Sequence, residues 1–404
     1  MKSKSLLLSL PIISLVLILA ISSCIEEMDF LVETCTFSDS TGNATNPNNV
    51  LYQEVLDEFV AKGLPGISVA IETPEHGWWV GSTGMARIED ETALNPCHTF
   101  NIESMSKPYI AVLILRLYED QELQIEDQIR EYLPEDIVEN IANADQATIR
   151  QLLNHTSGIV DLDAATMYVD IFNEPLYPAT LEEQFERYVY GKPAGFTPGE
   201  GYRYSNTGYA LLGMIVEAAS GMSLGDYFEQ EISALLGLTN TYYRSSANYP
   251  DIENLANAYA EIHPGQLTNV TDIEKNDMIL SMGQGGVITN PYENAIFLKE
   301  LMEGTLLEPA TLELMLTEEI EVSDDYTRGL GIGHYIGESR TYGEGYGHSG
   351  SYVGYRCEMI YFPDTEVTFS LATNAGSVLI SDNTSWFGPL LMELLSVTFT
   401  GQRE

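Results

Sequence analysis

The stretch FNIESMSKPYIAVLILRL, residues 100–117, places two serines and a lysine directly before a long apolar run. Residues three apart lie on one face of a helix, so Ser104 and Lys107 are expected to meet, while Ser106 points about 100° away from Lys107. Pro108 lacks a backbone N–H and disfavours helical geometry in the residue before it, so a helix is expected to begin close to this proline. The pattern predicts a polar Ser-x-x-Lys step at the start of a buried helix, with Ser104 among free backbone N–H groups.

The spacing of Ser104 and Lys107 suits nucleophilic catalysis. A serine hydroxyl is a weak nucleophile unless a base removes its proton, and a lysine removes it only as the neutral amine. Burial and a nearby cation lower the pKa of a lysine, whereas an adjacent carboxylate raises it. An N-cap serine followed by a surface lysine has the same spacing, so the step alone does not establish an active site.

Two later segments support the catalytic interpretation. Residues 198–221, PGEGYRYSNTGYALLGMIVEAASG, contain Tyr204-Ser205-Asn206 on a turn just before a helix expected to start near Thr207. Residues 342–357, YGEGYGHSGSYVGYRC, contain His348-Ser349-Gly350 leading directly into a strand. Ser-x-x-Lys, Tyr-Ser-Asn and His-x-Gly, in this order, resemble the motifs of the penicillin-recognising serine hydrolases, a superfamily that includes class C β-lactamases, D-alanyl-D-alanine carboxypeptidases and related esterases.

The resemblance covers residues 50–400 and implies a role for each matching position. It is supported by LLNHTSGI at 152–159, where we interpret His155 as structural, and by GQGGVITN at 283–290. Glycines near the histidine would let a substrate backbone lie against the strand. The implied roles are Ser104 as nucleophile, Lys107 and Tyr204 as the proton-transfer pair, Asn206, His348, Gly350 and Ser351 as substrate-binding residues, and the backbone N–H groups of Ser104 and Ser351 as the oxyanion hole.

The resemblance implies a hydrolase that forms an acyl-enzyme intermediate on an amide or ester, most like a D-alanyl-D-alanine carboxypeptidase or β-lactamase. The substrate would be an acyl-D-amino-acid peptide, a β-lactam or an ester. His348 replaces the lysine of many β-lactamases, and a neutral imidazole attracts a carboxylate less strongly. No arginine follows the GLG step at 329–331, although Arg328, Arg340 or Arg356 could reach a substrate carboxylate instead. An esterase acting on neutral esters and a penicillin-binding sensor with negligible turnover therefore remain as alternatives.

The order of strands and helices predicts an α/β protein of the α+β type, and the resemblance implies a β-lactamase/transpeptidase-like fold. GISVAIET and GWWVGSTG, separated by the turn-forming PEHG, predict a hairpin at 66–84, and further strands are expected after residue 325. We expect an antiparallel β-sheet flanked by N- and C-terminal helices, 50–62 and 385–399, and an inserted all-helical region at about 120–280. These elements form one hydrolase domain, residues 50–400.

The N-terminus predicts export. Residues 1–23 resemble a bacterial lipoprotein signal peptide that ends before Cys24, which would be lipidated, and residues 24–49 resemble a polar tether. We therefore expect an exported protein anchored to a bacterial membrane through an N-terminal lipid, at the outer membrane or the cell surface. A plain secretory signal is the alternative.

Charge and cysteine content limit the partners. The formal net charge is −42, or −44 once Lys2 and Lys4 are removed with the signal, so we expect no nucleic acid as a partner. No cysteine cluster or His-x-x-x-His spacing indicates a metal, and we expect no cofactor. Three further thiols, Cys35, Cys97 and Cys357, permit one disulfide whose pairing the sequence does not determine.

Overall fold

The structure is a computed structural model, and it describes residues 43–162, 164–174, 180–245, 254–263, 265–336, 341–376 and 386–403. All of these belong to the compact unit Phe37–Glu404. The predicted signal peptide, Cys24 and Cys35 lie outside the described residues. Among those that are described, no helix combines the length and the apolar character needed to span a membrane.

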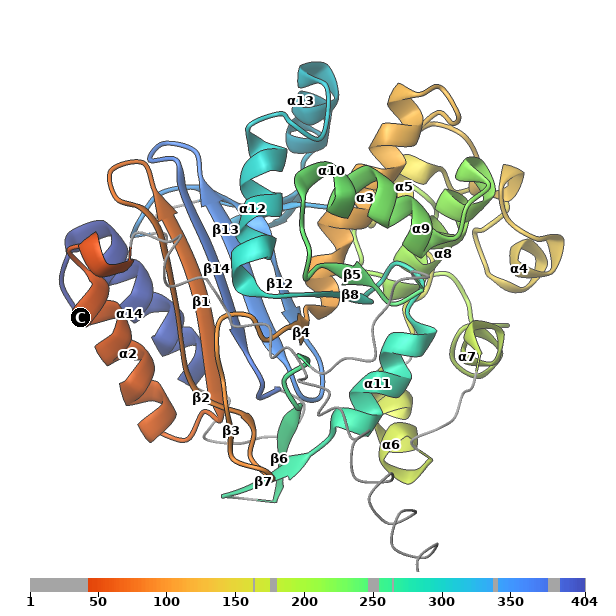
Figure 1. Ribbon diagram of the computed structural model, residues 1–404. Coiled ribbons are helices and arrows are strands. Elements are labelled where there is room, and N and C mark those ends of the chain that lie inside the picture. Colours follow the sequence, from red (N-terminus) through yellow and green to blue (C-terminus); the bar gives the residue numbers. More distant parts are fainter. Residues whose placement is uncertain are drawn as a thin grey trace, which may run out of the picture. The chain divides into compact units, whose positions relative to one another are not determined.

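Two segments from opposite ends of the chain meet at the centre of the main sheet. Strand β1 (Gly66–Thr73) pairs antiparallel with β2 (Gly77–Arg87) on one side and with β14 (Val367–Thr373) on the other. The β1–β2 pairing confirms the predicted hairpin. Because β14 lies about 300 residues further along the chain, the sheet joins the two ends of the fold (Figure 1).

The remaining strands extend this sheet on both sides in antiparallel order. Within the described residues the sheet runs β3-β2-β1-β14-β13-β12-β11-β10-β9. The bounds not yet given are β3 Thr92–Ala93, β9 Ile320–Ser323, β10 Tyr326–Arg328, β11 Gly333–Tyr335, β12 Gly345–Ser351 and β13 Arg356–Phe362. This arrangement confirms the expected antiparallel sheet.

One face of the sheet is covered by the first and last long helices. Helix α2 (Asn49–Ala61) and helix α14 (Phe387–Thr400) lie side by side on this face (Figure 1). Side chains alternate between the faces of a strand, and Ile67, Val69 and Ile71 of β1 point into the core shared with these helices. Both flanking helices were expected from their apolar spacing.

The opposite face holds helix α3 (Ser106–Glu119), whose first turn carries Lys107. Almost every residue of α3 is buried, which is typical of a central helix surrounded by other elements. The Tyr109 hydroxyl donates to Asn294 Oδ1 at 3.0 Å, and Asn294 Nδ2 donates to Ser370 Oγ of β14 at 2.9 Å. This chain of hydrogen bonds fixes α3 relative to the sheet through helix α12 (Pro291–Met302).

The inserted region is mainly helical but also contains short strands. Its strands β5 (Tyr242–Tyr243), β6 (Tyr259–His263) and β7 (Gln266–Asn269) were not expected there, and β5 joins β4 (Phe100–Asn101) and β8 (Val287–Thr289) in a small sheet. The helical elements of the inserted region are η3 Ile129–Glu131, α4 Glu135–Asn140, α5 Ile149–Leu153, α6 Ala164–Asn173, α7 Leu181–Tyr188, α8 Asn206–Ser220, α9 Leu224–Phe228, η4 Glu229–Ser233, α10 Ala234–Leu236 and α11 Thr271–Leu280. Three further helical elements of the described chain lie outside it: η1 Asn43–Thr45, η2 Glu103–Met105 and α13 Pro309–Thr317.

Two local boundaries differ from the sequence analysis. The expected strand after the His-Ser-Gly motif is interrupted, since β12 ends at Ser351 and β13 begins only at Arg356. The predicted tether lies mostly outside the described residues, but Asn43 near its end exchanges two hydrogen bonds with the main chain of Val80. An asparagine side chain offers both a donor and an acceptor. The Asn43 side chain therefore bonds the N–H and carbonyl groups of Val80 as the main chain of a neighbouring strand would.

Candidate active site

Ser104 and Lys107 lie against each other, as their spacing predicts. Ser104 is half-buried in the 3-10 turn η2, which leads into α3, and Lys107 Nζ lies 3.1 Å from its Oγ. Ser106, by contrast, is fully buried, and its Oγ accepts a hydrogen bond from the backbone N–H of Val287 at 3.1 Å. Ser104 is therefore the serine that both a base and a substrate can reach.

The surroundings of Lys107 favour the neutral amine. Its Nζ lies 2.9 Å from Asn206 Oδ1 and 2.8 Å from the carbonyl oxygen of Gln284, and both of these atoms only accept hydrogen bonds. The Ser104 hydroxyl is the third partner of Nζ, and in this structure it accepts from the amine. Once neutral, the amine keeps two N–H bonds for the Asn206 and Gln284 oxygens and can turn its lone pair toward the proton of Ser104. The pKa of Lys107 is lowered to about 7, chiefly by complete burial; Asp161 opposes the shift, the charge of Arg328 contributes to it, and Glu103 opposes it.

Tyr204 joins the same group from the turn before α8. Its hydroxyl is a hydrogen-bond partner of the Ser104 side chain, and its ring centroid lies 4.9 Å from Lys107 Nζ. Burial raises the pKa of Tyr204 to about 12, against the lowering effects of Arg328 and of the hydrogen bond with Ser104. Near neutral pH Lys107 is thus the better proton acceptor, and the phenol can pass a proton between its neighbours.

Asp161 is a residue of this site that sequence reasoning missed. Its carboxylate accepts hydrogen bonds from the Asn206 backbone N–H at 2.6 Å and from Asn206 Nδ2 at 3.3 Å. Asn206 is thereby oriented with its amide oxygen toward Lys107, and one Nδ2 hydrogen remains for the expected donation to substrate. Burial raises the pKa of Asp161. The only sequence signal was its position two residues after the LLNHTSGI turn.

His155 has the structural role expected from the sequence. Its Nδ1 accepts a hydrogen bond from the backbone N–H of Ser205 at 3.2 Å, and its ring lies 4.4 Å from that of Tyr204, centroid to centroid. Its backbone has φ of 62°, a left-handed conformation that costs energy for a residue other than glycine. Burial holds the pKa of His155 well below its usual range, so the ring is a neutral support for the Tyr204 turn.

His348 lies on β12 at the edge of this group. Its ring centroid is 6.4 Å from that of Tyr204, and its Nδ1 lies 2.6 Å from the carbonyl oxygen of Ser349. A carbonyl oxygen only accepts, so Nδ1 carries the proton and the buried Nε2 is a bare acceptor without a partner. Burial holds the pKa of His348 well below its usual range, and the imidazole is neutral.

The end of β12 lies beside the nucleophile. Strand β11 pairs with residues 345–347 of β12, and β13 pairs with residues 346–351. An added Cβ at Gly350 would lie 2.1 Å from the carbonyl oxygen of Ile102, which shows how closely β12 approaches the turn that holds Ser104. Gly350 is therefore required for packing, and the exposed Ser351 ends the strand. The oxyanion hole of Ser104 and Ser351 stays a prediction.

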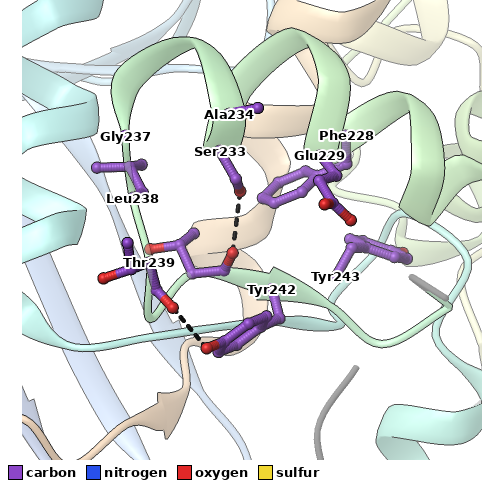
Figure 2. A pocket seen from close by; sticks show the side chains of 10 residues that line it. Phe228, Glu229, Ser233, Ala234, Gly237, Leu238, Thr239, Tyr242 and Tyr243 are labelled. Carbon is purple, nitrogen blue, oxygen red and sulfur yellow. Dashed lines mark hydrogen bonds between the residues drawn. The ribbon is translucent and has the colours of Figure 1, made fainter. Parts of the chain in front are cut away.

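A separate cavity lies away from these residues. It has a volume of about 280 Å³ and is lined by α9, η4, α10 and β5, including Ser233, Thr239 and Tyr242 (Figure 2). The Ser233 hydroxyl donates to a backbone carbonyl, that of Thr241, rather than to a base. The lining contains no lysine or histidine, so the cavity lacks the nucleophile and base present at Ser104.

The sequence of residues 52–381 matches the family model described as Beta-lactamase. The chain belongs to the beta-lactamase family. This confirms the resemblance stated above, and the solved structures compared below share the fold of this chain.

Curated relatives include a penicillin-binding protein and Protein flp. Penicillin-binding protein 4* of Bacillus subtilis (strain 168) is 28% identical over 307 residues, which are 72% of this chain and 64% of that protein. Protein flp of Staphylococcus aureus (strain N315) is 25% identical over 205 residues, 50% of this chain and 40% of that protein. This chain therefore spans less than two thirds of the length of either relative.

Solved structures of similar proteins cover almost the whole fold. The D-amino acid amidase from Ochrobactrum anthropi SV3, in complex with L-phenylalanine amide, has a TM-score of 0.72 and 24% identity, over 87% of this chain and 98% of the amidase. The penicillin binding protein from Bacillus halodurans has a TM-score of 0.69 and 20% identity, over 84% and 98%. At these identities the likeness establishes the fold.

Proposed function

We propose that this chain is an exported serine hydrolase that cleaves an amide or ester through an acyl-enzyme intermediate on Ser104. One observation carries the proposal: the buried Lys107 amine contacts the Ser104 hydroxyl, and its other two contacts are acceptors only. That arrangement supplies a base beside a nucleophile, which is what acyl transfer from a serine requires.

The steps follow from the positions of these groups. Lys107 accepts the Ser104 proton while the Oγ electron pair forms a bond to the carbonyl carbon of the substrate, whose oxygen takes the negative charge. The carbon–nitrogen or carbon–oxygen bond of the substrate then breaks, and the leaving group receives a proton through Lys107 or the Tyr204 hydroxyl. Water, activated by the same groups, releases the acyl chain and restores Ser104.

An amide of a D-amino acid or a D-alanyl-D-alanine peptide is the substrate class we favour. The end of β12 approaches the turn that holds Ser104, so an extended peptide backbone that runs along this strand would lie beside the nucleophile. The names of related proteins support this choice, since they include a D-amino acid amidase and a D-stereospecific amidohydrolase.

The decisive test is labelling with a fluorescent penicillin and a fluorophosphonate. Wild type should form a covalent adduct, and Ser104→Ala should lose it by about 10³-fold or more. Ser106→Ala is the matched control, because Ser106 is buried and bonded to the main chain, and it should keep the label. Normal labelling or turnover in Ser104→Ala would refute the proposal. An adduct in wild type that is never released would instead indicate a penicillin-binding sensor.

Neutral esters are a second candidate class, which the neutral state of His348 favours. This imidazole offers a bare Nε2 and no positive charge to a substrate carboxylate. Hydrolysis of acyl-D-alanyl-D-alanine without hydrolysis of short p-nitrophenyl esters would support the peptidase, and the reverse pattern would support the esterase.

Export and lipid anchoring at Cys24 belong to the same proposal. A disulfide at Cys97 supports an oxidising compartment, whereas Cys357 is a buried free thiol. Expression in a bacterium fed radiolabelled palmitate should label wild type in the membrane fraction and should not label Cys24→Ala. Equal label in both proteins, or none in either, would contradict lipidation at this cysteine.

A further inference from the structure

Arg328, at the end of β10, is a buried cation that has no carboxylate partner among the described residues. It is only 5% exposed, and within that part of the chain neither its Nε nor its Nη1 has a hydrogen-bond partner. Within the described part of the chain, no aspartate or glutamate forms an ion pair with it. An unpaired guanidinium away from water is costly, so a compensating group or a functional reason is expected.

The guanidinium lies among tyrosines of the active site. Its central carbon is 5.5 Å from the ring centroid of Tyr204 and 5.1 Å from that of Tyr326, and the Tyr202 hydroxyl is a hydrogen-bond partner. The negative faces of aromatic rings stabilise a desolvated cation in part. Because the free nitrogens have almost no accessible surface, a substrate cannot contact them without a rearrangement.

Arg328 and Lys107 approach the same phenol ring. Lys107 Nζ lies 4.9 Å from the Tyr204 ring centroid, so a proton on Lys107 would place two positive charges beside one buried ring. A negative charge on the Tyr204 oxygen would instead give the guanidinium the counter-charge that it lacks. The fixed charge therefore opposes protonation of Lys107 and favours deprotonation of Tyr204.

Other ionisable groups act on the same balance between the charged and neutral forms of Lys107. Asp161 and Glu103 favour the charged form of Lys107, and His155 and His348 are neutral. The groups that face Arg328 or the Ser104 site from the surrounding elements are Lys107, Glu103, His155, Asp161, Tyr202, Tyr204, Tyr209, Tyr326, Tyr335, His348 and Glu358. Arg328 is the permanently charged cation of this group.

We propose that Arg328 is a positioning residue of the hydrolase, whose solvent-shielded charge against the Tyr204 ring adds to burial in keeping Lys107 a neutral base for Ser104 near neutral pH. The inference rests on the proposed function for its catalytic meaning, but the state of Lys107 can be measured without turnover. An amine that titrates near the working pH accepts and returns a proton more efficiently than an ordinary lysine.

The test is a direct titration of Lys107. The chain has only seven lysines, so protein labelled with ¹³C at lysine Cε gives few signals, and the Lys107 signal is identified by its loss in Lys107→Arg. In Arg328→Gln its midpoint should rise by about 1 pH unit relative to wild type. Arg328→Lys, which keeps a charge, should move it less. Arg187→Gln is the matched control, since Arg187 pairs with surface carboxylates and carries the same charge change.

A second readout connects this titration to the reaction. The rate constant for fluorophosphonate inactivation should fall as the pH drops below the Lys107 midpoint. In Arg328→Gln this fall should occur at a higher pH. An unchanged Lys107 midpoint in Arg328→Gln overturns the proposal, and so does a loss of activity confined to carboxylate-bearing substrates, which would make Arg328 a substrate clamp. If the variant does not fold, a wild-type midpoint at the ordinary lysine value overturns it. Failure of Ser104 to label would refute the proposed function separately.

Discussion

At the scale of single residues, the site depends on a lysine amine that has no exposed surface. A buried charge is expensive, so the fold forces this amine toward its neutral form. Burial of the lysine serves catalysis only because Ser104 lies within hydrogen-bond distance of its amine. A solvated lysine at the same distance would remain protonated and could not act as the base. The site therefore requires both the burial of Lys107, which makes it a base, and the position of Ser104 beside it.

The linkage between Lys107 and stability gives the first prediction. The pKa of Lys107 falls from 10.5 to about 7 on folding, so between these values the unfolded chain binds one more proton than the folded protein. The free energy of unfolding should therefore rise with pH across that window. Below pH 7 the destabilisation caused by the buried lysine should have its full value. Against Lys107→Met, which lacks the effect, the difference should reach a few kcal/mol, since each pKa unit is worth about 1.4 kcal/mol.

Urea unfolding of wild type and Lys107→Met at pH 6, 8 and 10 measures this difference. Other groups titrate in the same range, so only the difference between the two proteins is diagnostic. A difference that stays constant from pH 6 to pH 10 would show that Lys107 keeps an ordinary pKa in the fold.

His155 gives a second prediction at this scale. His155→Ala should lower the free energy of unfolding by about 1–3 kcal/mol, because the backbone N–H of Ser205 loses its acceptor in a buried site. It should also slow acylation, since the Tyr204 ring loses a neighbour at 4.4 Å. His155→Asn is the matched control, because asparagine tolerates a positive φ and carries an acceptor. Equal losses in both variants, measured by urea unfolding, would argue against the hydrogen bond.

At the scale of elements, the site depends on how closely β12 approaches the turn η2. In Gly350→Ala the added methyl group would lie 2.1 Å from the carbonyl oxygen of Ile102, so β12 must move away from Ser104. We expect a lower melting temperature and a large loss of acylation rate. Differential scanning fluorimetry and fluorophosphonate labelling measure the two effects.

The control for Gly350 is another glycine in a regular element. Gly388 in α14 has open space around its Cβ position, and alanine is the better helix former by about 0.5–1 kcal/mol. Gly388→Ala should therefore leave labelling unchanged and keep or raise the melting temperature. If Gly350→Ala behaved like Gly388→Ala, the close packing of β12 on η2 would not be needed for activity.

Elements with a clear period were predictable from the sequence, and contacts between loops were not. The β1–β2 hairpin and helices α2 and α14 follow from local apolar spacing, and Ser104 and Lys107 meet because both belong to one helical start. Tyr204 and His348 could be placed only by resemblance. Asp161 was missed because its partner Asn206 is 45 residues away, and no local pattern encodes that contact.

The turn between β12 and β13 is buried, and its amino-acid sequence resembles that of a strand. Residues 352–355 read YVGY, with aromatic and β-branched side chains that favour strands, yet Tyr352 N–H donates to the carbonyl of Tyr355 and closes a turn. An added Cβ at Gly354 would lie 2.5 Å from Ala258, so the turn packs tightly on the chain near β6. Its apolar residues are buried by a neighbour far along the sequence, and this neighbour could not be predicted locally.

At the scale of the whole molecule, the net charge of −42 should make stability depend on salt. Mutual repulsion of surface carboxylates opposes the compact state, and salt weakens it over a Debye length of about 10 Å at 0.1 M. The melting temperature should rise by several degrees from 0.05 to 0.5 M NaCl, and KCl should act alike because screening is not ion-specific. A melting temperature that is flat or falls with both salts would contradict this expectation.

The pairing of β1 with β14 also constrains the order in which the protein can be made and folded. Residues 66–73 acquire their second strand neighbour only when residues 367–373 have been synthesised, so a growing chain cannot close its sheet on the ribosome. The nascent polypeptide must stay open for most of translation and needs protection from premature association. A chain held open in this way is also in the form that can be threaded through a narrow translocation channel.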